Sequence, residues 1–411
     1  MSSCTRARHY DAAQAGAMAV FLGRRRFRRR WQGVAAVCAA ATVASCGVAG
    51  ANGGPARSPA AVAGSIARGA EPVLGFRLNA VAAVSADDAW AGGLSHLGIA
   101  LHVIRWDGHA WRQVPAPSDG DFYGVAALSA ADAWGVGYGP SNEALIEHWN
   151  GTAWRPVATP SAVGPANLHA VAAVSPSDVW AVGGAATPTG QAVILHWNGT
   201  TWTRASSRTP PGVSSELNGV AAVSATSVWA VGDTNTRTHT IPLVQYWNGT
   251  AWRQVPTPAL RFGGVLTGVA ATSATNAWAV GVRTQTQGTG GLIEHWNGAA
   301  WTLVRSPALT KGGLAGVTAL SGNSAWAVGG SFPSSQAPVT VIERWNGTSW
   351  ARVPSPAPGF LAGVAAISAR NAWAVGVSAP NSNATGIIEH WDGQSWTCIS
   401  ATGTAGPCPP R

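Results

Sequence analysis

The stretch LTGVAATSATNAWAVGVRTQTQGTGGLIEHWNGAAW occupies residues 266–301, and its landmarks recur seven times along the chain. A first tryptophan returns every 44 to 49 residues, at Trp90, Trp134, Trp180, Trp229, Trp278, Trp326 and Trp373. A second, followed by Asn-Gly or Asp-Gly, lies at Trp106, Trp149, Trp197, Trp247, Trp296, Trp345 and Trp391. A third follows five residues later, at Trp111, Trp154, Trp202, Trp252, Trp301, Trp350 and Trp396. Such a period is typical of the blades of a propeller.

Each repeat contains four short apolar runs and no helical periodicity, which predicts a four-stranded antiparallel sheet. In the quoted copy the runs are 266–273, 277–280, 292–296 and 300–304. The Asn-Gly or Asp-Gly pair predicts a tight hairpin in which both residues have positive φ. The Asp, Asn or Ser two residues before each first tryptophan predicts a side-chain-stabilised turn.

One such sheet cannot bury both of its faces, whereas radial packing lets neighbouring blades cover each other. We therefore predict an all-β fold, a seven-bladed β-propeller over residues 78–400 with four antiparallel strands per blade. The blades are expected to start near residues 78, 122, 168, 217, 266, 314 and 361. Because the first copy opens on a first strand and the last ends on a fourth, we expect the ring to close by face packing without a shared strand.

The first 77 residues have the composition of a leader and a tether. Residues 1–46 combine an arginine cluster with an apolar segment too short to span a bilayer, which predicts an export signal. Val43–Cys46 resembles a lipobox, so Cys46 is a lipidation candidate, with ordinary signal cleavage as the alternative. Residues 47–77 are rich in Ala, Gly, Pro and Ser, as in flexible linkers, and residues 401–411 form a tail. We expect an extracytoplasmic protein, either secreted or lipid-anchored at the cell surface.

The formal net charge of +9 is concentrated in that leader. Eight of the 26 Lys and Arg residues and one of the 17 acidic residues lie in residues 1–46, which leaves the remainder near neutrality. A body without a basic stripe excludes nucleic acid as a partner. We expect the protein to contact a membrane only through the lipid anchor, and we expect it to be a monomer.

The cysteines divide by region. Cys4 and Cys38 belong to the leader, whereas Cys398 and Cys408 lie ten residues apart at the end of the chain. Outside the cytoplasm such a pair predicts a disulfide, here one that holds the tail to the last strand. A metal site is disfavoured because no further Cys or His lies near the pair.

Antiparallel strands place the variable segments, which join strands two and three and join successive copies, on one face. Binding residues usually lie on variable loops held by a rigid frame, so we expect the ligand at this face. Its central end should carry the second position of each first strand. Five of these seven positions are polar and are our candidate ligand-binding residues: Asn79, Tyr123, His169, Asn218 and Thr267. The other two are Ala315 and Ala362, and the alternative is that all seven are simply solvent-facing strand starts.

Four histidines precede second tryptophans, at His148, His196, His295 and His390, and Glu147, Glu294, Glu343 and Glu389 lie near this row. Third strands of adjacent blades should be on the order of 14 Å apart. A shared zinc ion needs ligands at about 2 Å. We therefore predict structural pairs, no metal site and no cofactor.

The sequence also contains no nucleophile elbow, P-loop or HExxH motif.

The pattern GVAAVSAxxAWAVG followed by HWNGTxW resembles Trp-rich propellers of secreted proteins in high-GC Gram-positive bacteria. It is more distantly similar to kelch repeats of galactose-oxidase-like propellers. The resemblance covers about residues 78–400 and implies the fold. The resemblance does not imply oxidase activity for this chain.

These observations favour a non-enzymatic binding or scaffold protein whose variable-loop face binds a protein or a glycan. One alternative is a multivalent lectin with repeated tryptophan pockets between blades. Another is a glycan hydrolase or lyase acting at the channel mouth, for which His169 is the catalytic candidate.

Overall fold

The computed structural model describes residues 76–95, 101–187, 190–209, 213–236, 238–286, 288–307, 309, 311–333, 337–378, 385–400, 404–406 and 408. The chain divides into two units, Met1–Val73 and Leu74–Arg411, and all described residues belong to the second. The predicted leader 1–46 with Val43–Cys46 therefore lies outside the described residues, as do residues 47–75 of the predicted tether.

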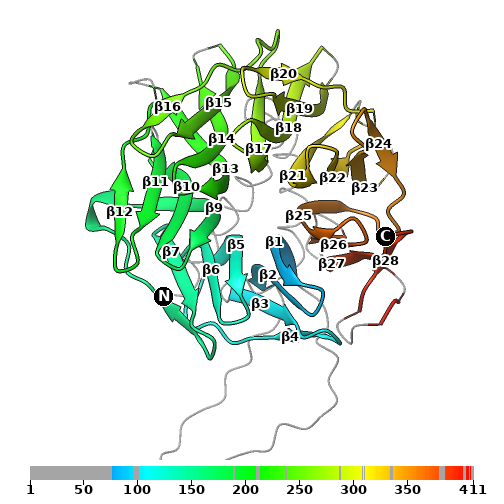
Figure 1. The fold of residues 1–411 in the computed structure, drawn as a ribbon, viewed down its shortest axis with the longest axis horizontal. Helices are drawn as coiled ribbons and strands as arrows, with labels where there is room; N and C mark the ends of the chain where they lie inside the picture. The colour runs from blue at the N-terminus through cyan, green and yellow to red at the C-terminus, as the bar shows by residue number, and fades with distance from the viewer. Residues whose placement is uncertain are drawn as a thin grey trace, which may run out of the picture. The chain divides into compact units, whose positions relative to one another are not determined.

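Seven antiparallel sheets, each of four consecutive strands, surround a common centre (Figure 1). The innermost strands are β1 (Phe76–Ser85), β5 (Asp121–Ser129), β9 (Ala166–Ser175), β13 (Ser214–Ser224), β17 (Gly264–Ser273), β21 (Gly312–Ser321) and β25 (Phe360–Ser368). The second strands are β2 (Asp88–Ser95), β6 (Asp132–Tyr138), β10 (Asp178–Ala185), β14 (Ser227–Asn235), β18 (Asn276–Gln285), β22 (Ser324–Ser331) and β26 (Asn371–Val377).

The third strands are β3 (Leu101–Trp106), β7 (Ala144–Trp149), β11 (Ala192–Trp197), β15 (Thr240–Trp247), β19 (Gly288–Trp296), β23 (Val339–Trp345) and β27 (Gly386–Trp391). The outermost strands are β4 (Trp111–Gln113), β8 (Trp154–Pro156), β12 (Trp202–Ala205), β16 (Trp252–Gln254), β20 (Trp301–Leu303), β24 (Trp350–Val353) and β28 (Trp396–Cys398). The predicted seven-bladed β-propeller is confirmed, and its first strands begin one to three residues earlier than expected. One 3-10 turn, η1 (Ser161–Val163), occurs among the described residues and lies between β8 and β9.

The ring closes without exchanging a strand, as the sequence predicted. Each sheet consists of four strands in chain order, and β1 of the first blade packs against β25 and β26 of the seventh. Closure therefore depends on side chains packed between two sheet faces, like the other six junctions.

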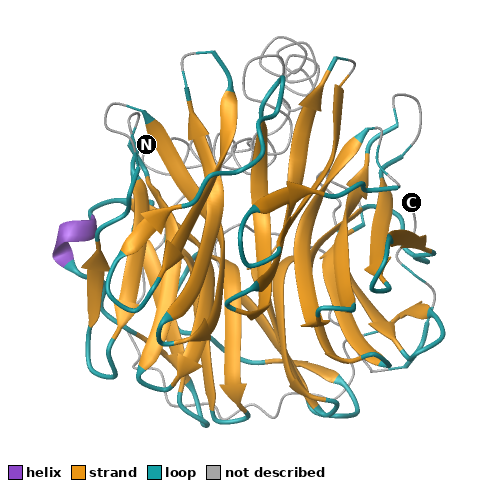
Figure 2. Ribbon diagram, turned by 45° about the horizontal axis from the view of Figure 1, so that its top comes forward, coloured by secondary structure: helices purple, strands orange, loops and turns teal. Residues whose placement is uncertain are grey.

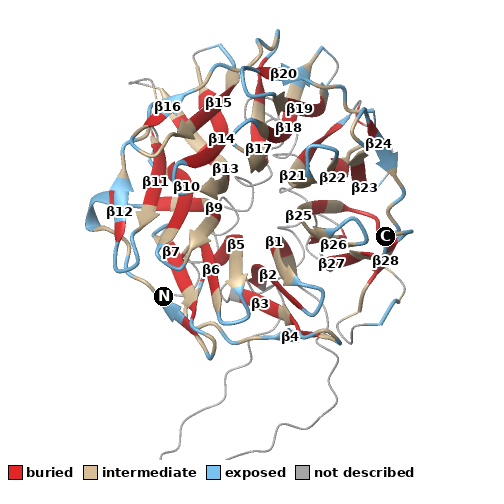
Figure 3. Cartoon of the chain, viewed as in Figure 1, coloured by how far each residue is buried: buried red, intermediate tan, exposed pale blue. Residues whose placement is uncertain are grey.

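Three tryptophans fill every junction between blades. The first tryptophan of one blade, at most 2% exposed in every case, packs against the second and third tryptophans of the next blade. Trp278 illustrates the geometry, because its ring centroid lies 4.8 Å from that of Trp345 and 5.1 Å from that of Trp350, the latter edge-on. The closing junction repeats it, since Trp373 lies 5.0 Å from Trp106 and 5.2 Å from Trp111. Figure 3 shows that buried residues concentrate on the second and third strands of the blades, whereas the outermost strands carry more exposed residues.

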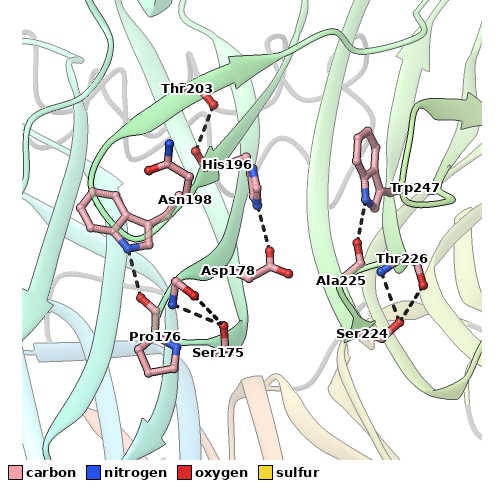
Figure 4. Close-up of polar contacts among 12 residues, drawn as sticks. Ser175, Pro176, Asp178, His196, Asn198, Thr203, Ser224, Ala225, Thr226 and Trp247 are labelled. Atoms are coloured by element: carbon pink, nitrogen blue, oxygen red, sulfur yellow. Dashed lines mark hydrogen bonds and ion pairs between the residues drawn. The ribbon is translucent and has the colours of Figure 1, made fainter.

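Each second tryptophan also holds the first turn of its own blade. Its indole Nε1 donates a hydrogen bond to a carbonyl between the first and second strands, as from Trp247 to Ala225 O at 3.0 Å (Figure 4). The same bond occurs in all seven blades, at 3.0 to 3.1 Å. The tryptophan thereby ties the inner strands to the outer strands.

The hairpin between third and fourth strands differs from the predicted two-residue turn. Trp247 pairs with Trp252, so the loop has four residues, and only its glycine, Gly249, has positive φ (91°). The Asn248 side chain replaces the second left-handed residue by accepting hydrogen bonds from the backbone N–H groups of Thr250 and Ala251. This is the side-chain mimicry of a turn that Asn and Asp favour.

Because consecutive strands of each blade are antiparallel, the described residues of the loops between second and third strands and of the linkers between blades lie on one face. Figure 2 shows loops and turns at both ends of the strands. Linkers between blades bond on that one face to the end of a second strand or to the loop that follows it, as from Thr284 N to Gly263 O and from Gly359 N to Pro338 O, both 3.0 Å. We call the face formed by these loops and linkers the variable-loop face. It offers a rigid frame for side chains at strand ends.

The tail returns onto the last blade. A disulfide joins Cys398 to Cys408, the pair expected from the sequence, and Ile399 forms an isolated bridge with Ala405. Cys398 is itself buried in the junction between the sixth and seventh blades. The tail is thus fastened to the outer edge of the seventh blade.

No helix among the described residues is long and apolar enough to cross a membrane.

Candidate binding site at the ring centre

The histidine row is structural in the geometry of the blade. His196 stacks on Trp180 of its own blade at 4.1 Å, and its Nε2–H donates to Asp178 Oδ1 at 2.9 Å (Figure 4). His148, His295 and His390 make the same two contacts in their blades. Within the described ranges, no three His, Cys, Asp or Glu side chains converge as metal ligands.

Two of the three blades that lack the histidine keep the same pairing with other chemistry. In the first blade, Arg105 lies over Trp90 at 4.9 Å and bonds to Asp88 at 2.8 Å. In the fourth, Tyr246 OH donates to Ser227 at 3.2 Å. The polar residue two positions before the first tryptophan is therefore the partner of this row in six blades, whereas the sequence assigned it to a turn. In the sixth blade Arg344 lies over Trp326 at 4.9 Å, but Ser324 Oγ has no hydrogen-bond partner among the described residues. The turn is held instead by the preceding serine, as when Ser224 Oγ accepts from Thr226 N at 3.3 Å.

Buried acids form a second row on the third strands. Glu147, Glu294, Glu343 and Glu389 are all 0% exposed, as is Gln245 at the equivalent position of the fourth blade. Most of them reach the linker from the preceding blade: Glu389 accepts from Ser355 Oγ at 2.8 Å and Glu147 accepts from Ser118 N at 3.0 Å. Neither carboxyl oxygen of Glu294 has a hydrogen-bond partner among the described residues.

The free energy of unfolding should fall as pH rises through the range in which these carboxyl groups are protonated in the folded chain but ionised in the unfolded chain. Burial raises the pKa of Glu294 to about 8, against an ordinary value near 4.5. The folded chain therefore keeps a proton that the unfolded chain has lost, so Glu294 costs stability progressively from about pH 4.5 up to about pH 8. Burial also raises the pKa of Glu389 to about 7, opposed by the bonds from Ser355 and Ala357.

We expect Glu294→Gln to remove roughly 2–4 kcal/mol of this decline in the free energy of unfolding. The measurement is urea unfolding at several pH values between 4.5 and 8.5. Glu143→Gln, at an exposed acid, is the matched control and should keep the slope of the native protein. Parallel curves for the native protein and Glu294→Gln would contradict the assignment.

The five candidate binding residues occupy one repeated position on the innermost strands. The register of these strands shifts there, as between Leu266 and Gly268 around Thr267, which is the signature of a bulge. Opposite the bulge lies a glycine of the second strand, and a Cβ on Gly281 would come within 2.0 Å of Val265 O. The bulge points the extra side chain towards the neighbouring blade.

Four of the five side chains bond to the carbonyl of the residue before the same position in the next blade. The contacts are Asn79 Nδ2 to Phe122 O (2.8 Å), His169 Nδ1 to Leu217 O (3.1 Å), Asn218 Nδ2 to Leu266 O (2.9 Å) and Thr267 Oγ1 to Leu314 O (2.9 Å). They are half-buried rather than solvent-facing strand starts. Each therefore joins two blades, which gives these side chains a structural role beside any role in binding.

Asn218→Ala should lower the free energy of unfolding by about 1 kcal/mol, the usual net value of one hydrogen bond. The variant loses the bond to Leu266 O and the longer contact with Asp233 Oδ1 at 3.3 Å. Thermal or urea unfolding measures the change. Asn323→Ala, at an exposed asparagine whose side chain has no hydrogen-bond partner among the described residues, separates this loss from a general effect of removing an asparagine. A loss no larger than that of Asn323→Ala would contradict the assignment.

A charged cluster at the centre was not predicted. Arg77 of β1 forms an ion pair with Asp121 of β5, and Asn79 Nδ2 donates to the other oxygen of Asp121 at 2.8 Å. The side chain of Asp121 is 1% exposed and that of Arg77 25%. Burial raises the pKa of the Asp121 carboxyl, while Arg77 and Asn79 act in the opposite direction.

An aromatic group continues the cluster on the next blade. Tyr123 stacks on Tyr138 at 5.5 Å and meets His169 edge-on at 5.8 Å. Burial raises the pKa of Tyr123 well above its ordinary value, so this phenol stays neutral. His169 donates through Nδ1 to a backbone carbonyl of the next blade, which leaves its Nε2 for a second contact.

Polar side chains at the centre of the ring are concentrated in the first blades and are missing from the last ones. The residue two before the bulge is polar in the first four blades, at Arg77, Asp121, Asn167 and Glu216, and non-polar in the last three, at Val265, Gly313 and Phe360. The bulge residue itself is polar in the first five blades and alanine in the last two. We call the side chains at these two positions in the first four blades the polar arc.

Half of the polar arc lies at positions that the sequence interpretation did not consider. A repeat that begins at its first shared hydrophobic residue excludes Arg77 and leaves Asp121 before the second blade. Comparing the residue before that point across the seven copies would have shown the change from charged or amide residues to Val, Gly and Phe.

Comparison with known proteins supports the fold alone. No family model matches the chain, and no curated protein matches it. Among solved structures it is similar to YCF48 from Cyanidioschyzon merolae, with 16% identity over 74% of this chain and 94% of that one (TM-score 0.50). It is also similar to a GH74 xyloglucanase from Xanthomonas campestris, with 14% identity over 80% of this chain and TM-score 0.54, and spans 55% of that enzyme. A PL25 ulvan lyase matches with 10% identity over 81% of this chain and 98% of its own (TM-score 0.52).

Proposed function

We propose that the chain is an exported, non-catalytic binding protein, of the Trp-rich secreted and distantly kelch-like type, that binds a protein or a glycan at the polar arc. One observation carries the proposal: the ring centre breaks the sevenfold repeat in side-chain chemistry. Structural requirements of a propeller apply equally to all seven blades. A one-sided arc of charge, amide and aromatic groups therefore supports recognition of one asymmetric ligand.

Contacts within the arc favour binding over catalysis. Arg77 and Asp121 neutralise each other, and the donors of Asn79, His169 and Asn218 already bond to neighbouring blades. Such fixed groups suit a pre-organised surface. Export is supported by the arginine-rich, apolar leader and by the Cys398–Cys408 disulfide, which persists in oxidising compartments. Lipid attachment at Cys46 remains part of the same proposal.

The test is a titration of the full chain with glycans and cell-wall polymers that bind in an initial screen, together with a variant carrying Tyr123→Phe and His169→Ala. We expect one ligand per chain and a loss of binding in the variant. Thr302→Val, at an exposed position on the outermost strand β20, is the control and should bind as the native protein does. Thermal unfolding verifies that each variant is folded.

The same titration separates the alternatives. A lectin with pockets at every junction would bind several ligands per chain and would keep most of them in the Tyr123/His169 variant. A hydrolase or lyase would release shortened products from the bound glycan, which chromatography of the reaction mixture detects. A stoichiometry well above one, or product release lost in the His169 variant, would overturn the proposal.

A further inference from the structure

The fifth blade carries a depression that is independent of the polar arc. It has a volume of about 220 Å³ and is lined by Arg283, Gly291, Leu292, Ile293, Leu303, Val304 and Arg305. It lies where β18 and β19 approach the linker after β20, on the side of the variable-loop face. The volume is below the roughly 300–1,000 Å³ of sites for drug-sized ligands, so it suits one small unit of a larger ligand.

Two guanidinium groups give the depression its charge. Within the described ranges, no acidic residue lines it and neither Arg283 nor Arg305 forms an ion pair. Arg283 Nε is buried and has no hydrogen-bond partner among the described residues. Guanidinium groups bind carboxylate, sulfate and phosphate oxygens through paired N–H donors. The depression therefore presents unused donors to an oxyanion.

Glycines on the two neighbouring strands leave space beside Arg283. Arg283 pairs with Gly264 on one side and Gly290 on the other, so no side chain flanks it at either position. Leu303 on β20 is 47% exposed, one of two large hydrophobic side chains so exposed among the described residues. An apolar surface thus lies beside the two arginines.

Only the fifth blade has arginine at these two positions of the repeat. At the position of Arg283 the other blades have Ser95, Gly139, Ala185, Thr234, Ser331 and Ser378. At the position of Arg305 they have Pro115, Ala158, Ser206, Pro256, Pro354 and Ser400. The repeat fold does not require arginine at either place, so these arginines are free to serve a function.

We propose that this depression binds an acidic saccharide unit, with its carboxylate or sulfate on Arg283 and Arg305 and its C–H face on Leu303. The oxyanion supplies the acceptors that the guanidinium groups lack. The sugar ring supplies apolar C–H groups of a size that one leucine covers. The site is separate from the polar arc, and this proposal does not depend on the polar arc binding a ligand.

The experiment measures binding of the full chain to oligogalacturonate and to dextran sulfate, with neutral dextran and poly-glutamate as comparison probes. Arg283→Gln with Arg305→Gln should weaken binding to at least one anionic glycan by about tenfold or more. Arg155→Gln with Arg253→Gln removes the same charge from exposed positions on β8 and β16 and should leave the affinity nearly unchanged. Arg305→Gln alone, at an exposed linker residue, provides a variant with little risk to folding.

Three outcomes would overturn the proposal. The first is no saturable binding of either anionic glycan by the native protein. The second is an equal loss in the two double variants, which would show attraction by net charge alone. The third is binding of poly-glutamate without binding of the glycans, which would make the partner an acidic peptide. Carboxylate and sulfate are distinguished by which of the two anionic probes binds.

Discussion

Replacing Trp278 by alanine is expected to lower the free energy of unfolding by about 3–5 kcal/mol, as for other large buried aromatic side chains. Trp278 is 1% exposed and contacts Trp345 and Trp350 across the junction of the fifth and sixth blades. It also stacks on His295 at 4.2 Å. The substitution leaves a cavity that rigid sheets on both sides cannot fill, so the loss of contacts is added to the loss of burial.

Urea unfolding followed by circular dichroism measures this effect. Trp296→Ala is the matched control, because that ring is only partly buried and shares the blade with Trp278. We expect its cost to be about half as large or less, since less apolar area leaves water. Equal costs for the two variants would show that burial at the junction does not set the contribution of each tryptophan.

Replacing Arg77 by methionine should cost about 3–5 kcal/mol, the usual penalty for leaving a buried charge without its partner. Asp121 is buried and keeps only Asn79 as a side-chain donor in that variant. The converse change, Asp121→Asn, should cost less, because Arg77 is 25% exposed and reaches water. Urea unfolding of the two single variants compares these costs.

The double variant Arg77→Met with Asp121→Asn completes a cycle and should recover much of the loss, because both charges are removed together. The pH dependence gives a second readout. Without Arg77, burial raises the pKa of Asp121 unopposed by a positive charge, so the Arg77→Met variant should lose stability relative to the native protein as pH rises from 4 to 8. A pH-independent difference would contradict a buried carboxylate as its cause.

The fold was predictable because its determinants repeat. Seven spaced tryptophan sets specify seven equal junctions, and the hairpin signal Asn-Gly appears at the same point of each copy. The absence of a shared closing strand followed from where the first and last copies begin and end. Tryptophan burial was predictable for the same reason, since large rings fill the widening space between radial sheets.

The centre was less predictable because its contacts join different copies. The sequence showed that Asn79, His169, Asn218 and Thr267 are polar, but the bulge that aims them at the next blade depends on register, which side-chain alternation does not reveal. Arg77 and Asp121 are 44 residues apart and meet only because equivalent strand ends lie side by side in the ring. Likewise, the aspartate two residues before Trp180 looked like a turn former, and its bond to His196 required the third strand to be in place.

The unexchanged strands have a consequence for how such a chain changes over generations. Every blade is one uninterrupted segment of about 44 to 49 residues, and every junction is made by the same three rings. A duplication or deletion of one segment therefore adds or removes a complete structural unit and leaves two matching surfaces to meet. By the same reasoning, new ends placed between any two blades should still permit folding, so the order of blades along the gene is separable from their order around the ring.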